Sequence, residues 1–249
     1  MYQGKKISVV MPALNEALAI GKVIRALQAL NSNGNAVVDE IIVCDNGSTD
    51  GTAAVCMQLG ATVVEQAIGG YGIACLTAIS AITSTDIVLF VDADDSCDIS
   101  QARELLEQIV QGADLVIGSR VLGKEEKGAL TPLQKFGNAL SSVLIQLIWR
   151  HPITDLGPFR AITMRALRQI NMQDKKFGWT VEMQVKAIQL GLTVREVPVN
   201  SKVRIGESKI SGTIRGSVGA GVGILSMIAK LRWQQKDFRA QQISSSQRS

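Results

Sequence analysis

The stretch IVLFVDADDS, residues 87–96, decides the fold. Its first five residues form a short, unbroken and mostly branched apolar run, which predicts a buried parallel strand. Because side chains alternate along a strand, Asp92 and Asp94 are expected on the same side at its carboxyl end. In an open α/β sheet this is the end where ligands bind.

The two carboxylates favour a bound cation. Two such groups about 4 Å apart repel by roughly 4 kcal/mol at an effective dielectric near 20. A Mg²⁺ or Mn²⁺ ion that also carries substrate phosphates relieves this repulsion. The alternative is a solvated acidic loop that caps the helix expected from about Ser100. The Asp-x-Asp pattern alone leaves both interpretations open.

Strand and helix patterns alternate over the first 120 residues. Helical spacing of apolar residues follows most of the strand patterns, which predicts right-handed βαβ units and a largely parallel sheet. Later patterns predict helices over 133–149 and after 182, and a last strand over 192–199. The earlier expected strands are 7–11, 40–45, 61–64, 86–92 and 114–118.

Composition excludes several classes of protein. With 249 residues and 46% hydrophobic content, the chain can bury a full core. The four cysteines show no CxxC pairing and are expected to be reduced core thiols. The single histidine, His151, rules out HExxH zinc chemistry, and no Walker phosphate loop is present. Gly70 and Gly72 follow the third strand instead of the first, so we interpret them as a glycine turn at a helix start.

The charge is divided unevenly along the chain. Residues 39–126 contain fifteen Asp or Glu against three Lys or Arg, whereas the chain from Lys202 onward contains nine basic residues against two acidic ones. An acidic part that attracts metal and a cationic part that attracts phosphate indicate a phosphate-bearing substrate, and they fit contact with an anionic surface.

Seven short motifs occur in the order found in one enzyme family. They are Pro12–Glu16, Asp45–Thr52, Gly69–Ala74, Asp92–Asp94, Gly118–Arg120, Thr154–Arg160 and Arg204–Lys209. Together they resemble the family 2 glycosyltransferases, and in particular the bacterial relatives of the dolichyl- and polyprenyl-phosphate sugar synthases. The resemblance covers about residues 7–215.

The resemblance implies a GT-A fold and inverting transfer of a hexose from a UDP- or GDP-sugar with Mg²⁺ or Mn²⁺. By this likeness Asp94 would be catalytic and would bind the metal, with Ser96 at a second metal position, and Asp45 would accept hydrogen bonds from the base. Arg120 would be catalytic and would gather phosphate together with Arg204 and Lys209. The full set implied for the donor is Pro12, Ala13, Asn15, Glu16, Asp45, Gly70, Asp92, Ala93, Arg204 and Lys209.

The acceptor is less well defined. A polyprenyl phosphate oxygen is already ionised and requires no base, whereas a hydroxyl acceptor would need a carboxylate, for which Asp155 is the candidate. The chain has Leu156-Gly157-Pro158-Phe159-Arg160 where the branch more often has Ser-Gly-Phe-Arg. The acceptor-side candidates are Arg120, Arg160, Trp179 and Glu182. Core packing for Trp179 and pairing with a helix N-terminus for Glu182 are the alternatives.

The C-terminal part predicts membrane contact. We expect a GT-A domain over 1–210, a basic and apolar helical segment over 211–239, and a disordered tail over 240–249. The apolar stretch 216–229 would reach about 21 Å as a helix, which is too short to span a bilayer, so we expect it to lie in the interface of an anionic leaflet. The 133–149 helix is either interfacial or a core helix.

These patterns lead to one predicted function and its rivals. The prediction is a glycosyltransferase that lies peripherally on the cytoplasmic face of the cell membrane and acts on polyprenyl phosphate. The alternatives are transfer to a soluble or saccharide hydroxyl, and a non-catalytic protein that binds nucleotide sugars. A nucleotidyltransferase is disfavoured because no glycine-rich first loop with a lysine is present. Nothing in the sequence indicates nucleic-acid binding.

Overall fold

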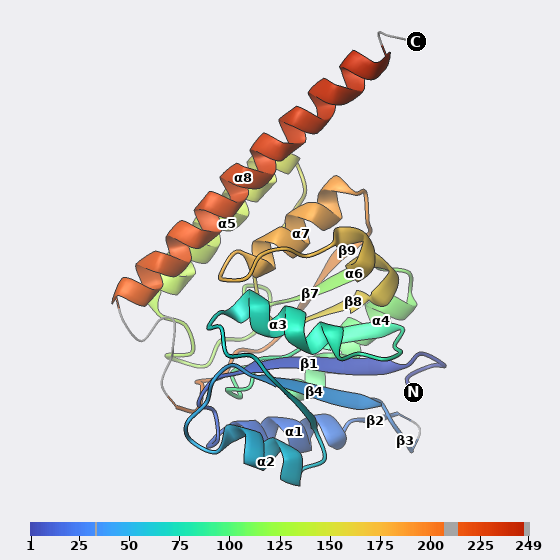
Figure 1. Cartoon of the computed structure of the whole chain (residues 1–249), viewed down its shortest axis with the longest axis vertical. Coiled ribbons are helices and arrows are strands. Elements are labelled where there is room, and N and C mark those ends of the chain that lie inside the picture. The colour runs from blue at the N-terminus through green and yellow to red at the C-terminus, as the bar shows by residue number, and fades with distance from the viewer. Residues whose placement is uncertain (33, 207–213, 247–249) are drawn as a thin grey trace.

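A seven-stranded sheet with helices on both faces forms the centre of the molecule (Figure 1). The computed structural model describes the backbone of residues 1–32, 34–206 and 214–246, and their side chains except those of 214–218 and 236–246. In spatial order the strands are β5 (Thr62–Glu65), β4 (Glu40–Asp45), β1 (Ile7–Ala13), β6 (Ile87–Phe90), β8 (Arg160–Thr163), β7 (Leu115–Ser119) and β9 (Val194–Pro198).

Side-chain alternation along the strands builds a core on each face of the sheet. Val9 and Met11 of β1 face one core, whereas Val10 faces the other. The first core is covered by α1 (Ile20–Gln28), α2 (Thr52–Gln58) and α4 (Ala102–Val110), which follows a short 3₁₀ turn, η1 (Ile99–Gln101). The second is covered by α3 (Tyr71–Ser80), α6 (Met164–Ile170) and α7 (Trp179–Gln189).

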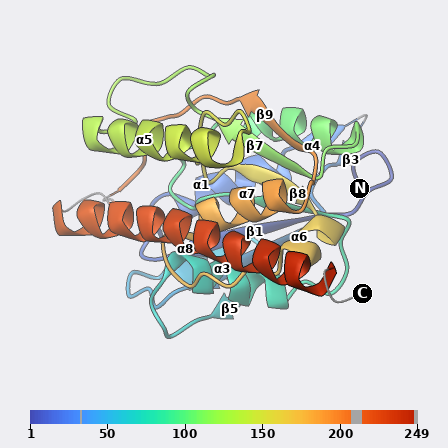
Figure 2. The ribbon, with the colours of Figure 1, turned by 90° about the horizontal axis from the view of Figure 1, so that it is seen from above.

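Two long helices form a further layer outside α7 (Figure 2). They are α5 (Pro132–Trp149) and α8 (Ile214–Ser246), and α8 contacts both α5 and α7. Ile145 of α5, Val185 of α7 and Ile228 of α8 belong to one apolar cluster. None of the described helices combines the length and apolar character needed to cross a bilayer.

The mostly parallel sheet that we predicted is confirmed, since four of the six strand pairings are parallel. Each predicted strand has a counterpart within about two residues of the expected limits. β1, however, continues through Pro12 instead of ending before it. It pairs with β4 as far as Ala13, but with β6 only as far as Val10, whose carbonyl accepts the last hydrogen bond, from the N–H of Val91.

Two features were not predicted. Strand β8 inserts between β6 and β7 and runs antiparallel to both, so strands that are consecutive in our prediction are not neighbours in space. A short hairpin, β2 (Asn31–Ser32) with β3 (Asn35–Ala36), lies apart from the main sheet. The strands involved have two to four residues, which is too short to show the alternation of apolar and polar residues that marks a strand in a sequence.

The C-terminal segment differs from the expectation of a disordered tail. Helix α8 does not end near residue 239 but continues to Ser246. The apolar residues of α8 are divided: Met227, Ile228 and Leu231 are buried in the cluster with α5 and α7, while Val222 and Trp233 are exposed. The expected tail residues 247–249 lie outside the described residues.

Candidate functional site

The acidic loop after β6 is held in a defined conformation. Asp94 and Asp95 are buried, and Asp95 has a left-handed backbone with φ of 58°. Lys22 and Lys202 contact the two carboxylate oxygens of Asp95 at 2.6 and 2.9 Å. Burial alone would raise the pKa of Asp95, but these two lysines lower it overall. The solvated-loop alternative therefore does not describe this segment; it is Asp98 that caps η1, through the N–H of Ser100.

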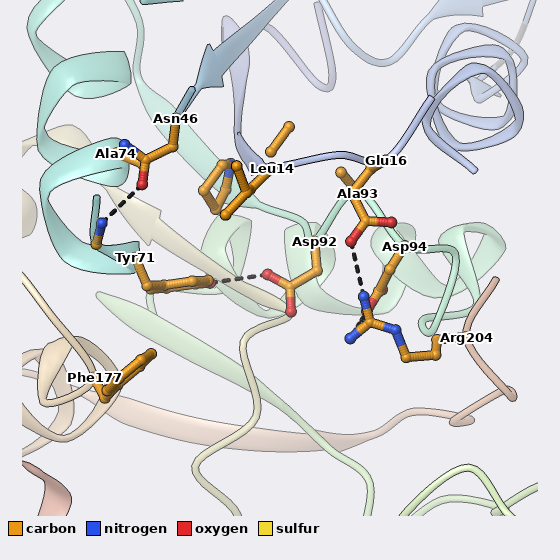
Figure 3. A pocket seen from close by; sticks show the side chains of 13 residues that line it. Leu14, Glu16, Asn46, Tyr71, Ala74, Asp92, Ala93, Asp94, Phe177 and Arg204 are labelled. Atoms are coloured by element: carbon orange, nitrogen blue, oxygen red, sulfur yellow. Dashed lines mark hydrogen bonds and ion pairs between the residues drawn. The ribbon is translucent and has the colours of Figure 1, made fainter. Parts of the chain in front are cut away.

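A pocket of about 210 Å³ opens beside this loop (Figure 3). It has a charged side, formed by Glu16, Asp92, Asp94 and Arg204, and a largely apolar side that includes Tyr71. The full lining is Pro12, Ala13, Leu14, Glu16, Asn46, Gly70, Tyr71, Ala74, Asp92, Ala93, Asp94, Phe177 and Arg204. The carboxyl ends of β1, β4 and β6 lie at this edge of the sheet, as the sequence predicted.

Arg204 connects two carboxylates across the pocket. Its Nη2 atom lies 2.8 Å from Glu16 Oε1, and its Nη1 atom lies 3.2 Å from Asp94 Oδ2. The backbone holds this arginine close, because the N–H of Ile205 donates to the carbonyl of Asp94. Residues separated by more than a hundred positions in the sequence thus form one charged cluster, in which a guanidinium can turn to phosphate oxygens.

Tyr71 is the neighbour of Asp92. The Tyr71 hydroxyl, at the first residue of α3, donates to Asp92 Oδ1 at 3.0 Å. Burial, and then the charge of Asp94, raise the pKa of Asp92 to about 7. Tyr71 lies in the motif Gly69–Ala74, for which the sequence predicted only a glycine turn; the signal for its role is a hydroxyl at the start of a helix.

Two residues expected to bind the donor do not line the pocket but lock its loops. Asn15, with φ of 53°, accepts a hydrogen bond from the N–H of Thr49 and donates its own N–H to Ser48 Oγ. Asp45 accepts from the N–H of Ser48 at 2.8 Å. The Asn15 bonds fasten the loop after β1 to the loop after β4, whereas the Asp45 bond holds the turn within the second loop. Asn46, which was not predicted, is the pocket-lining residue of that second loop.

The half-buried Arg120 and the buried Asp155 form an ion pair. Asp155 is fully buried, and both of its oxygens accept hydrogen bonds from Arg120, from the backbone N–H, Nε and Nη2 at 2.7–2.8 Å. Burial acts to lower the pKa of Arg120, but Asp155 raises it overall. Neither residue lines the pocket. Because both oxygens are occupied, Asp155 holds Arg120 and is not positioned as a base.

The other acceptor-side candidates are structural in this arrangement. Arg160 is buried and donates to the carbonyls of Leu156, Gly157 and Thr180, and burial lowers its pKa to about 10. Trp179 is 1% exposed and packs edge-on against Phe90.

Glu182 accepts from the N–H groups of Gln173 and Asp174. The expectation that Arg160, Trp179 and Glu182 face the acceptor is therefore corrected: for Trp179 the core alternative holds, and Glu182 ties down the segment before α7. The expected donor residue Lys209 lies outside the described residues.

Comparison with known proteins identifies the family. The model of Glycosyl transferase family 2 matches residues 8–170. The chain belongs to this family. It is 34% identical to an uncharacterized glycosyltransferase of Mycobacterium tuberculosis over 86% of this chain and 94% of that protein. It is 29% identical to the dolichyl-phosphate hexose transferase of Haloferax volcanii over 93% of this chain and 97% of that protein.

A solved structure supports the fold. The glucosyl-3-phosphoglycerate synthase from Mycobacterium tuberculosis, in complex with Mn²⁺, uridine diphosphate and phosphoglyceric acid, matches with a TM-score of 0.71 at 24% identity. The match covers 92% of this chain and 79% of that one. The predicted GT-A type of α/β fold and the predicted class of enzyme, a glycosyltransferase, are therefore confirmed.

The carboxylates of this glycosyltransferase suit a metal site in which protein and substrate both supply ligands, rather than a site enclosed by protein ligands alone. Among the described residues no group of three or more His, Cys, Asp or Glu side chains could enclose a metal. Asp94 turns Oδ2 toward the pocket side where Arg204 lies, and its Oδ1 accepts from the N–H of Ser96. The hydroxyl of Ser96 lies 4.0 Å from Cys97 Sγ. A Mg²⁺ or Mn²⁺ ion bound by one carboxylate and completed by substrate phosphates fits this set of ligands.

Proposed function

We propose that the protein is an inverting, metal-dependent hexosyltransferase that moves a sugar from a UDP- or GDP-sugar to polyprenyl phosphate at the cytoplasmic face of the membrane. The observation that carries this proposal is the pocket that Asp92 lines and in which Asp94 and Glu16 contact Arg204. Such a site offers both a place for a divalent cation and a guanidinium for the diphosphate. The relationship to the dolichyl-phosphate hexose transferase supports the acceptor.

Different residues of the site would bind different parts of the donor. Asp94 would hold the cation, with Ser96 as the candidate for a further ligand, and Arg204 would bind the diphosphate after leaving Asp94. When bound, the cation supplies a Lewis acid at the departing diphosphate. Asp92, oriented by Tyr71, would face the sugar. The loop around Pro12 and Ala13 would receive the nucleoside.

The surroundings of Asp155 favour a phosphate acceptor. A hydroxyl acceptor needs a base to take its proton, and Asp155, the candidate for that role, is fully buried with both oxygens bound to Arg120. An acceptor phosphate is already ionised, so that positioning and electrostatics suffice. Arg120, whose side chain is 22% exposed, would then assist through its positive charge.

The outer face of α5 supports membrane contact. Five large apolar side chains at helical spacing are exposed on it: Leu133, Phe136, Leu140, Val143 and Leu147. On α8, Val222, Leu225 and Trp233 are exposed as well. The sequence from Thr131 to Thr154 and from Ser208 to Lys236 contains no Asp or Glu, but it contains basic residues such as Lys135, Arg150 and Lys230. Most of the charged residues around this apolar face are basic, although one of them, Lys135, is paired with Glu125, and such a face suits an anionic bilayer.

A soluble acceptor is the second candidate. The solved glucosyl-3-phosphoglycerate synthase, of the same fold, was crystallised with phosphoglyceric acid. A small phosphorylated acid could meet the same positive charges as a lipid phosphate. A non-catalytic role in binding nucleotide sugars is the third, and turnover of any donor would exclude it.

The test is a donor and acceptor screen that measures release of nucleoside diphosphate. UDP- and GDP-hexoses are combined with Mn²⁺ or Mg²⁺ and with a polyprenyl phosphate, a phosphorylated small acid, or a saccharide. We expect turnover with the polyprenyl phosphate. Faster turnover with the small acid would contradict the lipid acceptor but leave the transferase intact, and absence of both binding and turnover with every donor would contradict the proposed function.

Membrane contact is tested separately with vesicles of phosphatidylglycerol and phosphatidylcholine. Replacing Phe136, Leu140 and Leu147 by Ser should weaken binding by about tenfold for each residue that enters the bilayer. The matched control replaces Leu18, Met57 and Ile68, which are at least as exposed as Leu140 but lie on other elements. Equal binding of both triple variants would contradict the assignment of this face.

A further inference from the structure

Part of the pocket wall comes from outside the region that defines the family. The family model ends at residue 170, and two lining residues, Phe177 and Arg204, lie beyond it. Arg204 belongs to the charged side, whereas Phe177 lies beyond Tyr71 on the side away from Asp94 (Figure 3). Phe177 itself therefore belongs to the later part of the chain, beyond the region that the family model covers.

On its inner side, the segment that carries Phe177 caps helix α3. The carbonyl of Lys176 accepts from the N–H of Gly72, and that of Lys175 accepts from the N–H of Ile73. A Cβ on Gly70 would collide with the carbonyl oxygen of Lys175. Glycine at the start of α3 thus lets the segment approach closely, and the segment satisfies backbone donors that a helix start leaves unpaired.

On its outer side, the same segment packs against α8. A Cβ on Gly178 would lie 2.9 Å from Cε and 3.0 Å from Cβ of Met227, so only glycine fits there without a shift. A Cβ on Gly223 would lie 3.6 Å from Cβ of Phe177, which is ordinary contact, so that a longer side chain extending in this direction would meet Phe177. Gly223 and Met227 are four residues apart and so share one face of the helix.

Helix α8 is itself fixed behind this contact. Ile228 and Leu231 are buried with side chains of α5 and α7, and Gln189 Nε2 of α7 donates to the carbonyl of Leu231. Phe177 therefore lies between an anchored helix and the pocket. Gly223 lies against Phe177, and Met227 lies against the next residue, Gly178.

We propose that α8 is a positioning element of the donor site: Gly223 and Met227 set Phe177, and Phe177 sets the width of the pocket for a nucleoside diphosphate sugar. The inference rests on the proposed function, in which this pocket holds the donor. Gly223 and Met227 act through Phe177 and touch no substrate, so they are positioning residues. The donor site is then completed by a helix that the family model does not cover.

The experiment uses a graded series at residue 223 in the full chain. The matched controls are Gly219→Leu and Gly221→Leu, because a Cβ at either position meets nothing within 4 Å. Binding of UDP and of GDP in the presence of Mn²⁺ is measured by calorimetry, and the donor KM and kcat are measured for the active donor. Thermal unfolding is recorded for each variant.

We expect Gly223→Ala to bind like the wild type, because a methyl group makes only ordinary contact. Gly223→Leu should weaken binding of the nucleoside diphosphate by about tenfold, since an added side chain must push Phe177 into the pocket. The donor KM should rise while kcat at saturating donor stays close to the wild-type value. Both control leucines should leave Kd and KM unchanged.

A double-mutant cycle tests whether the effect passes through Phe177. In a Phe177→Ala background, Gly223→Leu should add no further loss. If Gly223→Leu does not fold, Met227→Ala replaces it in the cycle and should change Kd by a few fold in wild type and not in Phe177→Ala. Additive effects in the cycle would overturn the inference.

The remaining outcomes separate the two proposals. Equal affinities for Gly223→Leu and Gly221→Leu, together with nucleotide binding by the wild type, would overturn the role of α8 alone. A wild-type protein that binds neither UDP nor GDP with Mn²⁺ would overturn both the proposed function and this inference.

Discussion

The chain up to residue 170 and the chain after it contribute to the pocket in different ways. The first part supplies loops at the ends of strands β1, β4 and β6, and most residues that we assigned to the donor from its motifs do line the pocket. The later part supplies Phe177, which we did not predict, and Arg204, which we did. Of its other candidates, Trp179 and Glu182 are buried, and Lys209 lies outside the described residues.

The difference shows how far strand topology determines a site. A loop that directly follows a central strand is fixed by the sheet, so its side chains are fixed with it. Phe177 owes its position to contacts with α3 on one side and α8 on the other, and these contacts join residues far apart in the sequence. Motifs therefore describe the first part of the site better than the second.

The strongest test of the first part is Asp94→Ala. Loss of the carboxylate that would hold the cation should lower turnover by about 10²- to 10³-fold, and chelation of the metal should have a similar effect on the wild type. The control is Asp98→Ala, in the same loop but engaged in capping η1. Unchanged turnover of Asp94→Ala in a folded protein would remove the metal role.

Trp179→Ala tests the structural role of the later part. Because this side chain is 1% exposed and packs on Phe90, its loss should lower the free energy of unfolding by about 3–5 kcal/mol, measured by urea denaturation. Trp179→Phe should recover much of this stability and keep the wild-type acceptor KM. If Trp179→Ala instead raised the acceptor KM without changing the stability, Trp179 would be a residue that contacts the acceptor.

Arg204→Lys addresses the arginine of the later part that contacts two carboxylates of the first part in the pocket. A lysine cannot reach Glu16 and Asp94 with a planar fork, so we expect the donor KM to rise by about tenfold. Arg195→Lys serves as the control, since Arg195 bonds to Gln108 away from the pocket. An equal, small effect of both substitutions would argue against a diphosphate contact by Arg204.

The smallest expected effect is that of Tyr71→Phe. Removal of the hydroxyl deletes one hydrogen bond to Asp92, for which about 1 kcal/mol, or roughly fivefold in kcat/KM, is reasonable. The fold should be unaffected because the ring remains. If kcat/KM does not change, Asp92 is held in place without Tyr71.

Much of the fold and part of the site could be predicted from the sequence. The position of the acidic loop was predictable because it follows a buried central strand, although β6 ends at Phe90 and a turn, not strand alternation, orients Asp92 and Asp94. Asn15 and Asp45 show what a motif cannot predict. A motif residue can either bind a ligand or hold a loop in place, and the sequence does not distinguish these two roles. The Arg120–Asp155 pair depends on a fold in which residues 35 apart meet, which no local pattern reveals.

Pro12 has a consequence for the shape of the site. Along β1, Val10 directs its carbonyl toward β6, so Pro12, two residues on, presents the same edge of the strand but has no N–H to offer. β6 cannot continue its ladder there, and its chain departs into the acidic loop. Because Pro12 has no N–H, the hydrogen-bond ladder between β1 and β6 stops here and the two strands separate at the pocket entrance. Any other residue at position 12 would supply an N–H donor with which the ladder could continue.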